Sequence, residues 1–519
     1  MHLRIQPTKN CHLAYRHSEQ RYRKCISVTV MNDPAFLGLD LGSSSIKAVG
    51  LDESGQCVAA AKRTHLIRTG LGGIAEQDPY TWHEIAGQVL RELAQQLQEL
   101  SLTPAAIAAT GQMDGPVLID QHQQPVTPVQ MWCDSRCDVQ CQIIEDRIPA
   151  NQLLAMTGHC AVTGYTAPKL MWIAEHTPQV FQTATHIIFP KDFITLSLTD
   201  QIVSDYSDAA NSLILDIHQG QWDDAIMELL ALPPINFPTL ANSTEQIGSI
   251  SASGAAWSGL PEGTAVATGA GDSIAAALGA GLHDPSMVQI VIGSAGNVNC
   301  VLNEPRIDPQ GRIHTGYFVD HAHWICTAVQ QSAGASLLWW SDITGLEPEQ
   351  LVNEIDTSNP PTALFAPYLC GERTPHLDSN IRAAFTNLNQ HTSRRDMTRA
   401  ILEGVAFSFK DAFEVLGSMN INPSCAAICG GGGDSKVWQR IIAAVLDVQL
   451  IPSTGDTTAK GAAMLAACAA GRFKTWLEAI DSWPEANQRV EAVPTDIDQY
   501  QRSYLEFKEL YPSLKSFYK

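Results

Sequence analysis

The stretch FLGLDLGSSSIKAVG, residues 36–50, decides the fold that this sequence predicts for its first half. Residues 36–40 are mostly apolar and are typical of a buried strand. The GSSS run at 42–45 is a turn, since glycine and serine interrupt regular structure. Residues 46–51 return to strand character, so the stretch predicts two neighbouring strands joined by a tight, hydroxyl-rich turn.

The residues that follow extend this pair into a sheet with a helix. A DESG turn at 52–55 precedes a third predicted strand at 56–62. Residues 82–100 carry apolar side chains at helical spacing, and 107–111 and 116–120 are again strand-like. A three-strand meander followed by a helix and more strands predicts an α/β domain of ribonuclease H-like layout.

The same pattern begins again far downstream. Residues 287–292 predict a strand, GSAG at 293–296 a turn, and 297–302 a second strand. The segment LGSS at 41–44 aligns with IGSA at 292–295. A repeated segment of this kind indicates a duplicated unit, so we expect two ribonuclease H-like domains around a cleft.

The chain is too long for one hydrophobic core, because cores stop growing at about 250–300 residues. We expect an N-terminal domain at 34–284, a C-terminal domain at 285–487, and a polar helical tail on the surface at 488–519. Residues 1–33 are basic where the rest is acidic, and they predict either a disordered extension or an over-long start. Met31 would then be the natural beginning.

Composition excludes several classes of partner. The formal net charge of -21 disfavours nucleic acid and anionic membrane surfaces, whose phosphates repel an acidic protein. No apolar run reaches the length of a membrane span. The thirteen cysteines are scattered without a pairing framework, which suits a reducing compartment, so we expect a cytoplasmic protein.

Four glycine-rich turns follow predicted strands, at 42–45, 269–271, 293–296 and 430–433. Glycine lets backbone N–H groups approach a phosphate closely, and hydroxyl side chains add donors. One such turn is weak evidence for a phosphate site, but four across two halves are stronger. The G-x-x-x-x-G-K-[ST] loop and the G-x-G-x-x-G fingerprint are both absent from the sequence.

Two carboxylates stand at these turns. Asp40 ends the first predicted strand, and Asp272 follows the glycine turn at 269–271 and opens an apolar helix. An aspartate at a helix start is often only an N-cap. Phosphoryl transfer to a hydroxyl also needs a carboxylate that accepts the proton. Spacing alone leaves these two interpretations equally weighted.

The quoted opening stretch resembles the phosphate-binding opening of the actin, heat-shock-70 and sugar kinase superfamily. The segment GQMDGPVLID at 111–120 is similar to the xylulokinase signature G-Q-M-H-G. Further similar segments occur in the family's order: EQDP at 76–79, GYTAPK at 164–169, PKD at 190–192, SDYSDA at 204–209, GD at 271–272, GERTPH at 371–376, EGVA at 403–406 and the glycine run at 430–433. From about residue 36 to 470 the chain therefore resembles the FGGY family of carbohydrate kinases, and most of all its xylulokinase branch.

This resemblance implies a role for individual residues. Asp272 matches the catalytic base, and Asp40 matches the carboxylate that acts through Mg²⁺ or its waters, with Asp272 close to the same ion. The residues that match nucleotide-binding positions are Gly42, Ser43, Ser44, Lys47, Ser294, Gly334, Gly430, Gly431 and Ser435. The residues that match sugar contacts are Met113, Asp114, Asp272 and Ser273.

The implied activity is ATP-dependent phosphorylation of a small sugar, first of all D-xylulose to D-xylulose 5-phosphate, with ATP and Mg²⁺. We expect sugar and ATP as partners, no nucleic acid and no membrane, and a homodimer as the candidate assembly. Xylulokinases usually carry histidine at the position of Asp114, asparagine at Ser273 and arginine at Asp434. An ionised aspartate can only accept hydrogen bonds, so the first of these departures affects the choice of sugar.

Three alternatives follow. The chain could phosphorylate another ketose or a polyol, such as ribulose, a pentitol or a glycerol-like acceptor. It could be a nucleotide-gated interaction protein of the actin or heat-shock-70 kind, although that group lacks the segments at 111–115 and 372–375. It could also be a kinase that has lost turnover, which the presence of both Asp40 and Asp272 disfavours.

Overall fold

The computed structural model describes residues 33–356, 363–453, 455–484 and 489–518. The region from Asp33 to the C-terminus forms one compact unit. The predicted extension at 1–33 lies outside the described residues except for Asp33, the first residue of strand β1.

The first sheet has six strands in the order β14-β15-β6-β1-β2-β3. Their bounds are β1 Asp33–Leu41, β2 Ser45–Leu51, β3 Cys57–Thr64, β6 Leu102–Gly111, β14 Gln246–Ser249 and β15 Ala265–Gly271. The predicted meander is confirmed, because β1, β2 and β3 pair antiparallel in sequence order. Strands β6 and β15 run parallel to β1, which brings the C-terminal ends of three strands to one edge.

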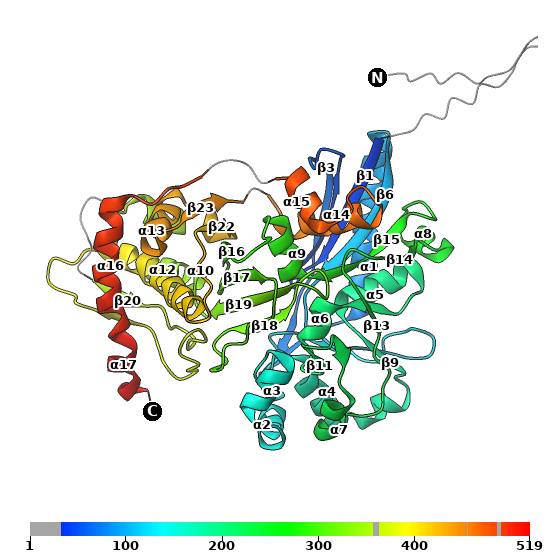
Figure 1. The fold of residues 1–519 in the computed structure, drawn as a ribbon, viewed down its shortest axis with the longest axis horizontal. Helices are drawn as coiled ribbons and strands as arrows, with labels where there is room; N and C mark the ends of the chain where they lie inside the picture. Colours follow the sequence, from blue (N-terminus) through cyan, green and yellow to red (C-terminus); the bar gives the residue numbers. More distant parts are fainter. Residues whose placement is uncertain (1–32, 357–362, 454, 485–488, 519) are drawn as a thin grey trace, which may run out of the picture. The chain divides into compact units, whose positions relative to one another are not determined.

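Helices cover both faces of this sheet (Figure 1). Helix α1 (Pro79–Glu99) and helix α5 (Pro190–Thr199) pack on one face, with Trp82 and Leu93 fully buried. Helix α9 (Asp272–Gly279) and helix α14 (Thr457–Ala469) share a second core with the other face.

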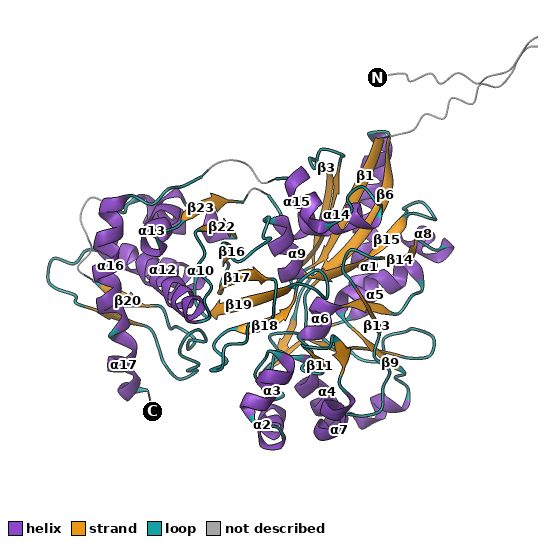
Figure 2. Cartoon of the chain, viewed as in Figure 1, coloured by secondary structure: helices purple, strands orange, loops and turns teal. Residues whose placement is uncertain are grey.

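The second sheet repeats the arrangement, in the order β18-β19-β17-β16-β22-β23. Its bounds are β16 Met287–Ile292, β17 Gly296–Leu302, β18 His314–Tyr317, β19 Trp324–Gln330, β22 Cys425–Cys429 and β23 Gln449–Pro452. Strands β16, β17 and β19 form an antiparallel meander, and β22 and β23 run parallel to β16. The predicted duplication into two ribonuclease H-like α/β domains is confirmed. Helices α10 (Gly334–Thr344), α12 (Arg394–Ser418) and α13 (Lys436–Leu446) pack around this sheet (Figure 2).

Helix α14 follows the second sheet in the chain but packs on the first. A Cβ on Gly38 of β1 would lie 2.1 Å from the Ala459 carbonyl oxygen. A Cβ on Gly461 would lie 1.8 Å from the carbonyl oxygen of Ala275 in α9. Glycine is therefore required at both positions, since real Cβ atoms do not approach other atoms so closely. The close contact ties the two halves together beside the end of β15.

The C-terminal tail is helical, as the sequence predicted, but one face of it is buried rather than on the surface. Helix α16 (Pro494–Lys508) is followed by helix α17 (Leu510–Leu514). Tyr500, Tyr504 and Phe507 of α16 are buried in the core of the second half, and the Tyr504 hydroxyl donates to Asp411 Oδ1 at 2.6 Å. Aromatic residues at a spacing of three to four are the signal of this buried stripe.

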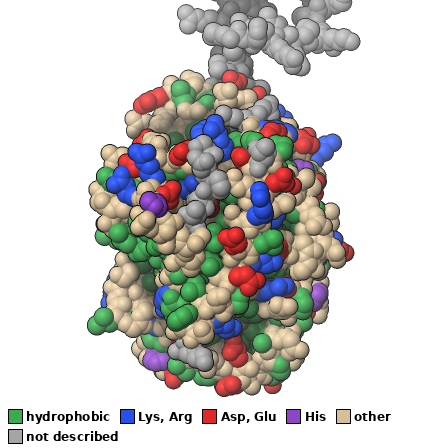
Figure 3. Space-filling view, turned by 90° about the vertical axis from the view of Figure 1, so that its left-hand side faces the viewer, with side chains coloured by type: hydrophobic (Ala, Val, Ile, Leu, Met, Phe, Trp, Pro, Cys, Tyr) green, Lys and Arg blue, Asp and Glu red, His purple; other side chains and the backbone are tan. Residues whose placement is uncertain are grey.

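Two surface properties bear on function. Among the described residues, no helix combines the length and the apolar character that crossing a bilayer requires. Acidic and basic side chains are interspersed over the face shown in Figure 3.

Candidate active site

The β1–β2 turn presents the first group of predicted nucleotide residues. The Gly42 N–H donates to the Ser45 carbonyl oxygen at 3.1 Å, which closes the turn. The Ser43 hydroxyl donates to Gln112 Oε1 at 3.2 Å and accepts from the Trp132 indole N–H at 2.9 Å. Ser44 is exposed at the tip of the turn. The turn is thus anchored to the segment that carries Met113 and Asp114.

Lys47, in β2, joins two carboxylates. Its Nζ lies 3.1 Å from Asp40 Oδ2 and 2.5 Å from Asp456 Oδ2. Asp40 is buried, and burial raises its pKa to about 6 although the Lys47 charge opposes the rise. Asp456 caps α14 by accepting from the Ala459 N–H at 3.1 Å. Sequence reasoning missed Asp456, and an aspartate just before an apolar helix is a weak signal for a function.

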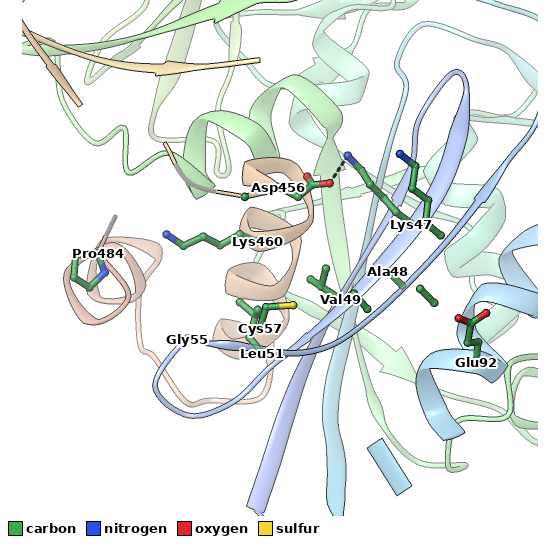
Figure 4. Close-up of a pocket in the computed structure, with 14 residues that line it drawn as sticks. Lys47, Ala48, Val49, Leu51, Gly55, Cys57, Glu92, Asp456, Lys460 and Pro484 are labelled. Atoms are coloured by element: carbon green, nitrogen blue, oxygen red, sulfur yellow. Dashed lines mark ion pairs between the residues drawn. The ribbon is translucent and has the colours of Figure 1, made fainter. Parts of the chain in front are cut away.

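A cavity of about 640 Å³ adjoins the Lys47–Asp456 pair (Figure 4). Val49, Leu51 and Cys57 line its strand side, and Asp456 and Lys460 line its helix side. Its wall holds neither the predicted base nor the predicted sugar contacts. Of the residues predicted to bind nucleotide, Lys47 lines this cavity.

Asp272 is the first residue of α9, directly after β15. The N-cap of α9 is Gly271, so the carboxylate of Asp272 is not the helix cap. Its Oδ1 accepts from the Ser273 N–H at 2.6 Å. Burial raises the pKa of Asp272 to about 7, and the negative charges of Asp40 and Asp114 add to the rise. The charges of Asp40 and Asp114 therefore both act on the carboxylate of Asp272.

A cluster of buried charged side chains holds Gly271, the residue before Asp272, through a chain of hydrogen bonds. The Gly271 N–H donates to the Ser207 hydroxyl at 3.0 Å, and that hydroxyl donates to Asp205 Oδ2 at 2.5 Å. Lys191 Nζ lies 3.0 Å from Asp205 Oδ1 and 3.7 Å from Asp208 Oδ2, and all three side chains are fully buried. The sequence marked these segments as similar to the family without assigning them a role.

Met113 and Asp114 follow β6 and lie beside the Asp272 turn. A Cβ on Gly271 would lie 2.5 Å from Met113 Sδ, and the Ser273 hydroxyl lies 3.4 Å from the same sulfur. Asp114 has a φ of 73°, and its carbonyl oxygen accepts from Lys169 Nζ at 3.1 Å. Burial raises the pKa of the Asp114 carboxyl to about 6. The structure therefore brings together the four residues predicted to contact sugar.

The second group of predicted nucleotide residues surrounds the end of β16. Ser294 is exposed in the β16–β17 turn. Gly334 opens α10, and its N–H donates to the Gly293 carbonyl oxygen at 2.8 Å. Gly430 has a φ of 85°, and a Cβ there would lie 2.6 Å from the Ile292 carbonyl oxygen.

The remaining two predicted nucleotide residues extend the same group. Gly431 is exposed with open space beside it, and Ser435 caps α13 by accepting from the Trp438 N–H at 3.3 Å. Gly334 and Gly430 therefore both depend on glycine beside the end of β16, where an added Cβ would lie 2.5 Å and 2.6 Å from the carbonyl oxygens of Gly293 and Ile292.

The carboxylates also fit a hydrated Mg²⁺ ion. Mg²⁺ is usually held by one or two protein carboxylates and completes its shell with water and substrate phosphates. Asp40 Oδ1 is buried without a hydrogen-bond partner, so it has a free acceptor for such an ion or its waters. Within the described ranges, no cluster of three or more His, Cys, Asp or Glu forms a complete metal cage.

Comparison with known proteins agrees with this geometry. Residues 35–279 match the N-terminal domain of the FGGY family of carbohydrate kinases, and residues 288–470 match its C-terminal domain. Xylulose kinase of Lactococcus lactis is 33% identical over 486 residues, which is 92% of this chain and 96% of that protein. Xylulose kinase of Escherichia coli is 31% identical over 457 residues, with 86% and 93% covered.

A solved structure with a high similarity comes from Brucella ovis and is described as a xyloylose kinase. It superimposes with a TM-score of 0.88 at 31% identity and covers 93% of this chain and 100% of that one. Both family domains and nearly the full length of these relatives are present. This chain belongs to the FGGY family of carbohydrate kinases.

Proposed function

We propose that this carbohydrate kinase transfers the γ-phosphoryl group of ATP to a hydroxyl of a small ketose, with D-xylulose as the first candidate and D-xylulose 5-phosphate as its product. The observation that carries the proposal is the position of Asp272. It is a half-buried carboxylate whose pKa is raised to about 7, and it lies near Asp40 and the Met113–Asp114 segment. The xylulose kinases among its relatives support the choice of sugar.

In this mechanism Asp272 accepts the proton of the acceptor hydroxyl as the oxygen attacks the γ-phosphorus. The new O–P bond forms, and the bond to the bridging oxygen of ADP breaks. Lys47 and the N–H groups of the β1–β2 turn stabilise the phosphate charge. Mg²⁺ held near Asp40 would neutralise part of that charge when bound. The glycine turns around Gly293 and Gly430 hold the nucleotide.

Asp114 favours a second candidate, a related ketose or polyol. A carboxylate at this position accepts a hydrogen bond from a hydroxyl but gains nothing from a carbonyl oxygen. An acceptor that presents a hydroxyl here would therefore be preferred. Ribulose, pentitols and glycerol are the acceptors to compare with D-xylulose.

An ADP-release assay with purified protein tests the proposal. D-xylulose, ribulose, pentitols, glycerol and gluconate are compared, with ATP alone as the blank. The Asp272→Asn variant should lose about 10²–10⁴-fold in kcat, because its amide cannot take a proton, while calorimetry still detects sugar binding. Asp284→Asn, in a surface loop whose carboxylate is 40% exposed, is the matched control and should keep full activity. If no acceptor raises the rate of ADP release above that of the ATP-only blank, the proposal is refuted.

A further inference from the structure

Three buried polar atoms without partners surround the predicted sugar segment. They are Asp114 Oδ1, His314 Nε2 and Arg373 Nη2, and each is inaccessible to solvent and makes no hydrogen bond in the structure. Asp114 follows β6 in the first half, while His314 opens β18 and Arg373 lies after β20 (Leu364–Ala366) in the second half. An unpaired buried polar atom is costly, so three around one place point to a ligand that pairs with them.

Contacts and charges show that the three side chains share one environment. The Arg373 charge opposes the rise in the pKa of Asp114 and lowers the pKa of His314. The Tyr165 hydroxyl lies 2.9 Å from His314 Nδ1, and the Arg373 charge opposes the rise in the pKa of Tyr165. The rings of His159 and His314 stack with centroids 5.6 Å apart.

Asn211 connects this group to the sugar segment. Its Oδ1 lies 3.1 Å from His159 Nε2, its Nδ2 lies 3.9 Å from Met113 Sδ, and its side chain opposes the rise in the pKa of Asp114. His314 of the second half is therefore linked to the sugar segment through His159 and Asn211 of the first half.

Elementary chemistry limits what each free atom offers. A guanidinium only donates, so Arg373 Nη2 offers a donor. Burial and the Arg373 charge hold the pKa of His314 well below its ordinary value, so the ring is neutral. A neutral imidazole carries one proton, so His314 Nε2 offers a donor in one tautomer and an acceptor in the other. The site therefore presents a donor at Arg373, an acceptor at Asp114 Oδ1 and a group of either kind at His314.

We propose that Asp114, His314 and Arg373 bind the hydroxyls of the acceptor that lie beyond the reacting end, so that the substrate is a neutral polyhydroxylated chain held by both halves. This inference rests on the proposed kinase function and extends it to the substrate class. Hydroxyls both donate and accept, so adjacent hydroxyls can satisfy all three atoms. A sugar carboxylate could accept from Arg373, but it cannot donate to Asp114 and is repelled by it.

The test compares the best acceptor of the ADP-release assay with its analogue that lacks the hydroxyl farthest from the phosphorylated one. For D-xylulose this analogue is 1-deoxy-D-xylulose. Arg373→Gln and His314→Phe should lower kcat/KM for the full acceptor by about 10- to 100-fold, because each removes a hydrogen-bonding group at that end. The same variants should change kcat/KM for the deoxy analogue by less than about threefold, since that partner is already missing. The KM for ATP should not change.

Matched controls are Arg382→Gln and His283→Phe, which alter an arginine and a histidine outside this group and should leave both acceptors unaffected. Asp114→Asn should raise the affinity for gluconate at least about tenfold, because it removes the repulsive charge. An equal loss for both acceptors, or no loss for either, would overturn the proposal and leave Arg373 and His314 with a structural role.

Sugar binding measured by calorimetry without ATP separates this proposal from the kinase reaction. Wild-type protein that binds sugar but releases no sugar-dependent ADP would refute the proposed function alone. Variants that bind the full sugar as tightly as wild type would refute the present inference alone.

Discussion

At the residue scale, the site is dominated by three carboxylates that lie near one another, Asp40 buried and Asp114 and Asp272 half-buried. Asp40, Asp114 and Asp272 each have a raised pKa, and in each case burial is the largest cause. At Asp40 the positive charge of Lys47 lowers the pKa, and the negative charge of Asp456 raises it. Such perturbed groups are typical of functional sites, because a base must titrate near the working pH.

The pKa of Asp272 predicts an acid limb in the activity. A carboxyl whose pKa is raised from 3.8 to about 7 is protonated, and inactive as a base, below that pH. We therefore expect kcat/KM for the sugar to fall about tenfold per pH unit below about pH 7. Asp114→Asn removes a charge that raises this pKa, so it should move the limb to lower pH, whereas Asp284→Asn should not. A limb that stays near pH 4 in wild type would contradict the assignment.

Asp114 also predicts a change in substrate ranking. Asp114→His replaces an obligate acceptor with a side chain that can donate to a sugar carbonyl. We expect the variant to shift relative kcat/KM toward D-xylulose and away from acceptors that place a hydroxyl at this position. The measurement is the kcat/KM ratio between D-xylulose and the other accepted substrates. An unchanged ranking would mean that Asp114 does not contact the sugar and would restore D-xylulose as the favoured acceptor.

Motif residues at this scale were predictable, but their partners were not. Asp40, Asp114 and Asp272 stand at strand ends next to glycine turns, which is a local signal. Asp456 and His314 approach them only through the tertiary fold, from segments with no signature of their own. Their roles depend on contacts across more than a hundred residues of sequence, which spacing cannot reveal.

At the element scale, the turns around β16 depend on glycine geometry. Gly430→Ala places a methyl group 2.6 Å from the Ile292 carbonyl oxygen and also strains a residue with φ of 85°. The turn must move, and displacements of about 1 Å can cost about 10²-fold in turnover. We expect kcat/KM for ATP to fall by up to this factor while the affinity for sugar stays unchanged.

Gly345→Ala is the matched control, because Gly345 has a φ of 68° but a Cβ added there would meet no atom within 4 Å. Both variants carry the strain of a left-handed residue, about 1–2 kcal/mol, so both should lose some stability in thermal unfolding. Equal ATP kinetics in the two variants would show that Gly430 is needed only for the turn itself.

The two meanders could be predicted because each strand pair is local and bounded by glycine turns. The position of α14 could not, since its apolar sequence fits any buried helix. Gly461 and Gly38 were the available cues, yet a lone glycine does not name its neighbour. The spacing of the aromatic residues in α16 indicates its buried face. The polar composition of the whole segment masked this signal.

At the scale of the whole molecule, the two halves carry complementary parts of the proposed site. The first half supplies Asp40, Lys47 and Asp272, and the second supplies the turns at Gly293, Gly334 and Gly430. The close α9–α14 contact joins the halves beside Asp272, and its glycine-to-backbone packing leaves little room for sliding. A rotation about this contact would move the distant parts of the halves most and the carboxylate of Asp272 least.

We therefore predict that ATP and sugar together close the halves. A bound nucleotide would contact turns from both, and closure would exclude water that otherwise competes as phosphoryl acceptor. Small-angle scattering with sugar and a non-hydrolysable ATP analogue should show a smaller radius of gyration than with either ligand alone. Gly430→Ala should require more analogue for the same compaction, because its nucleotide turn is displaced, while Gly345→Ala should match wild type. An unchanged radius of gyration at saturating ligands would mean that the halves are already closed, and Arg373 and His314 would then reach the sugar without any domain movement.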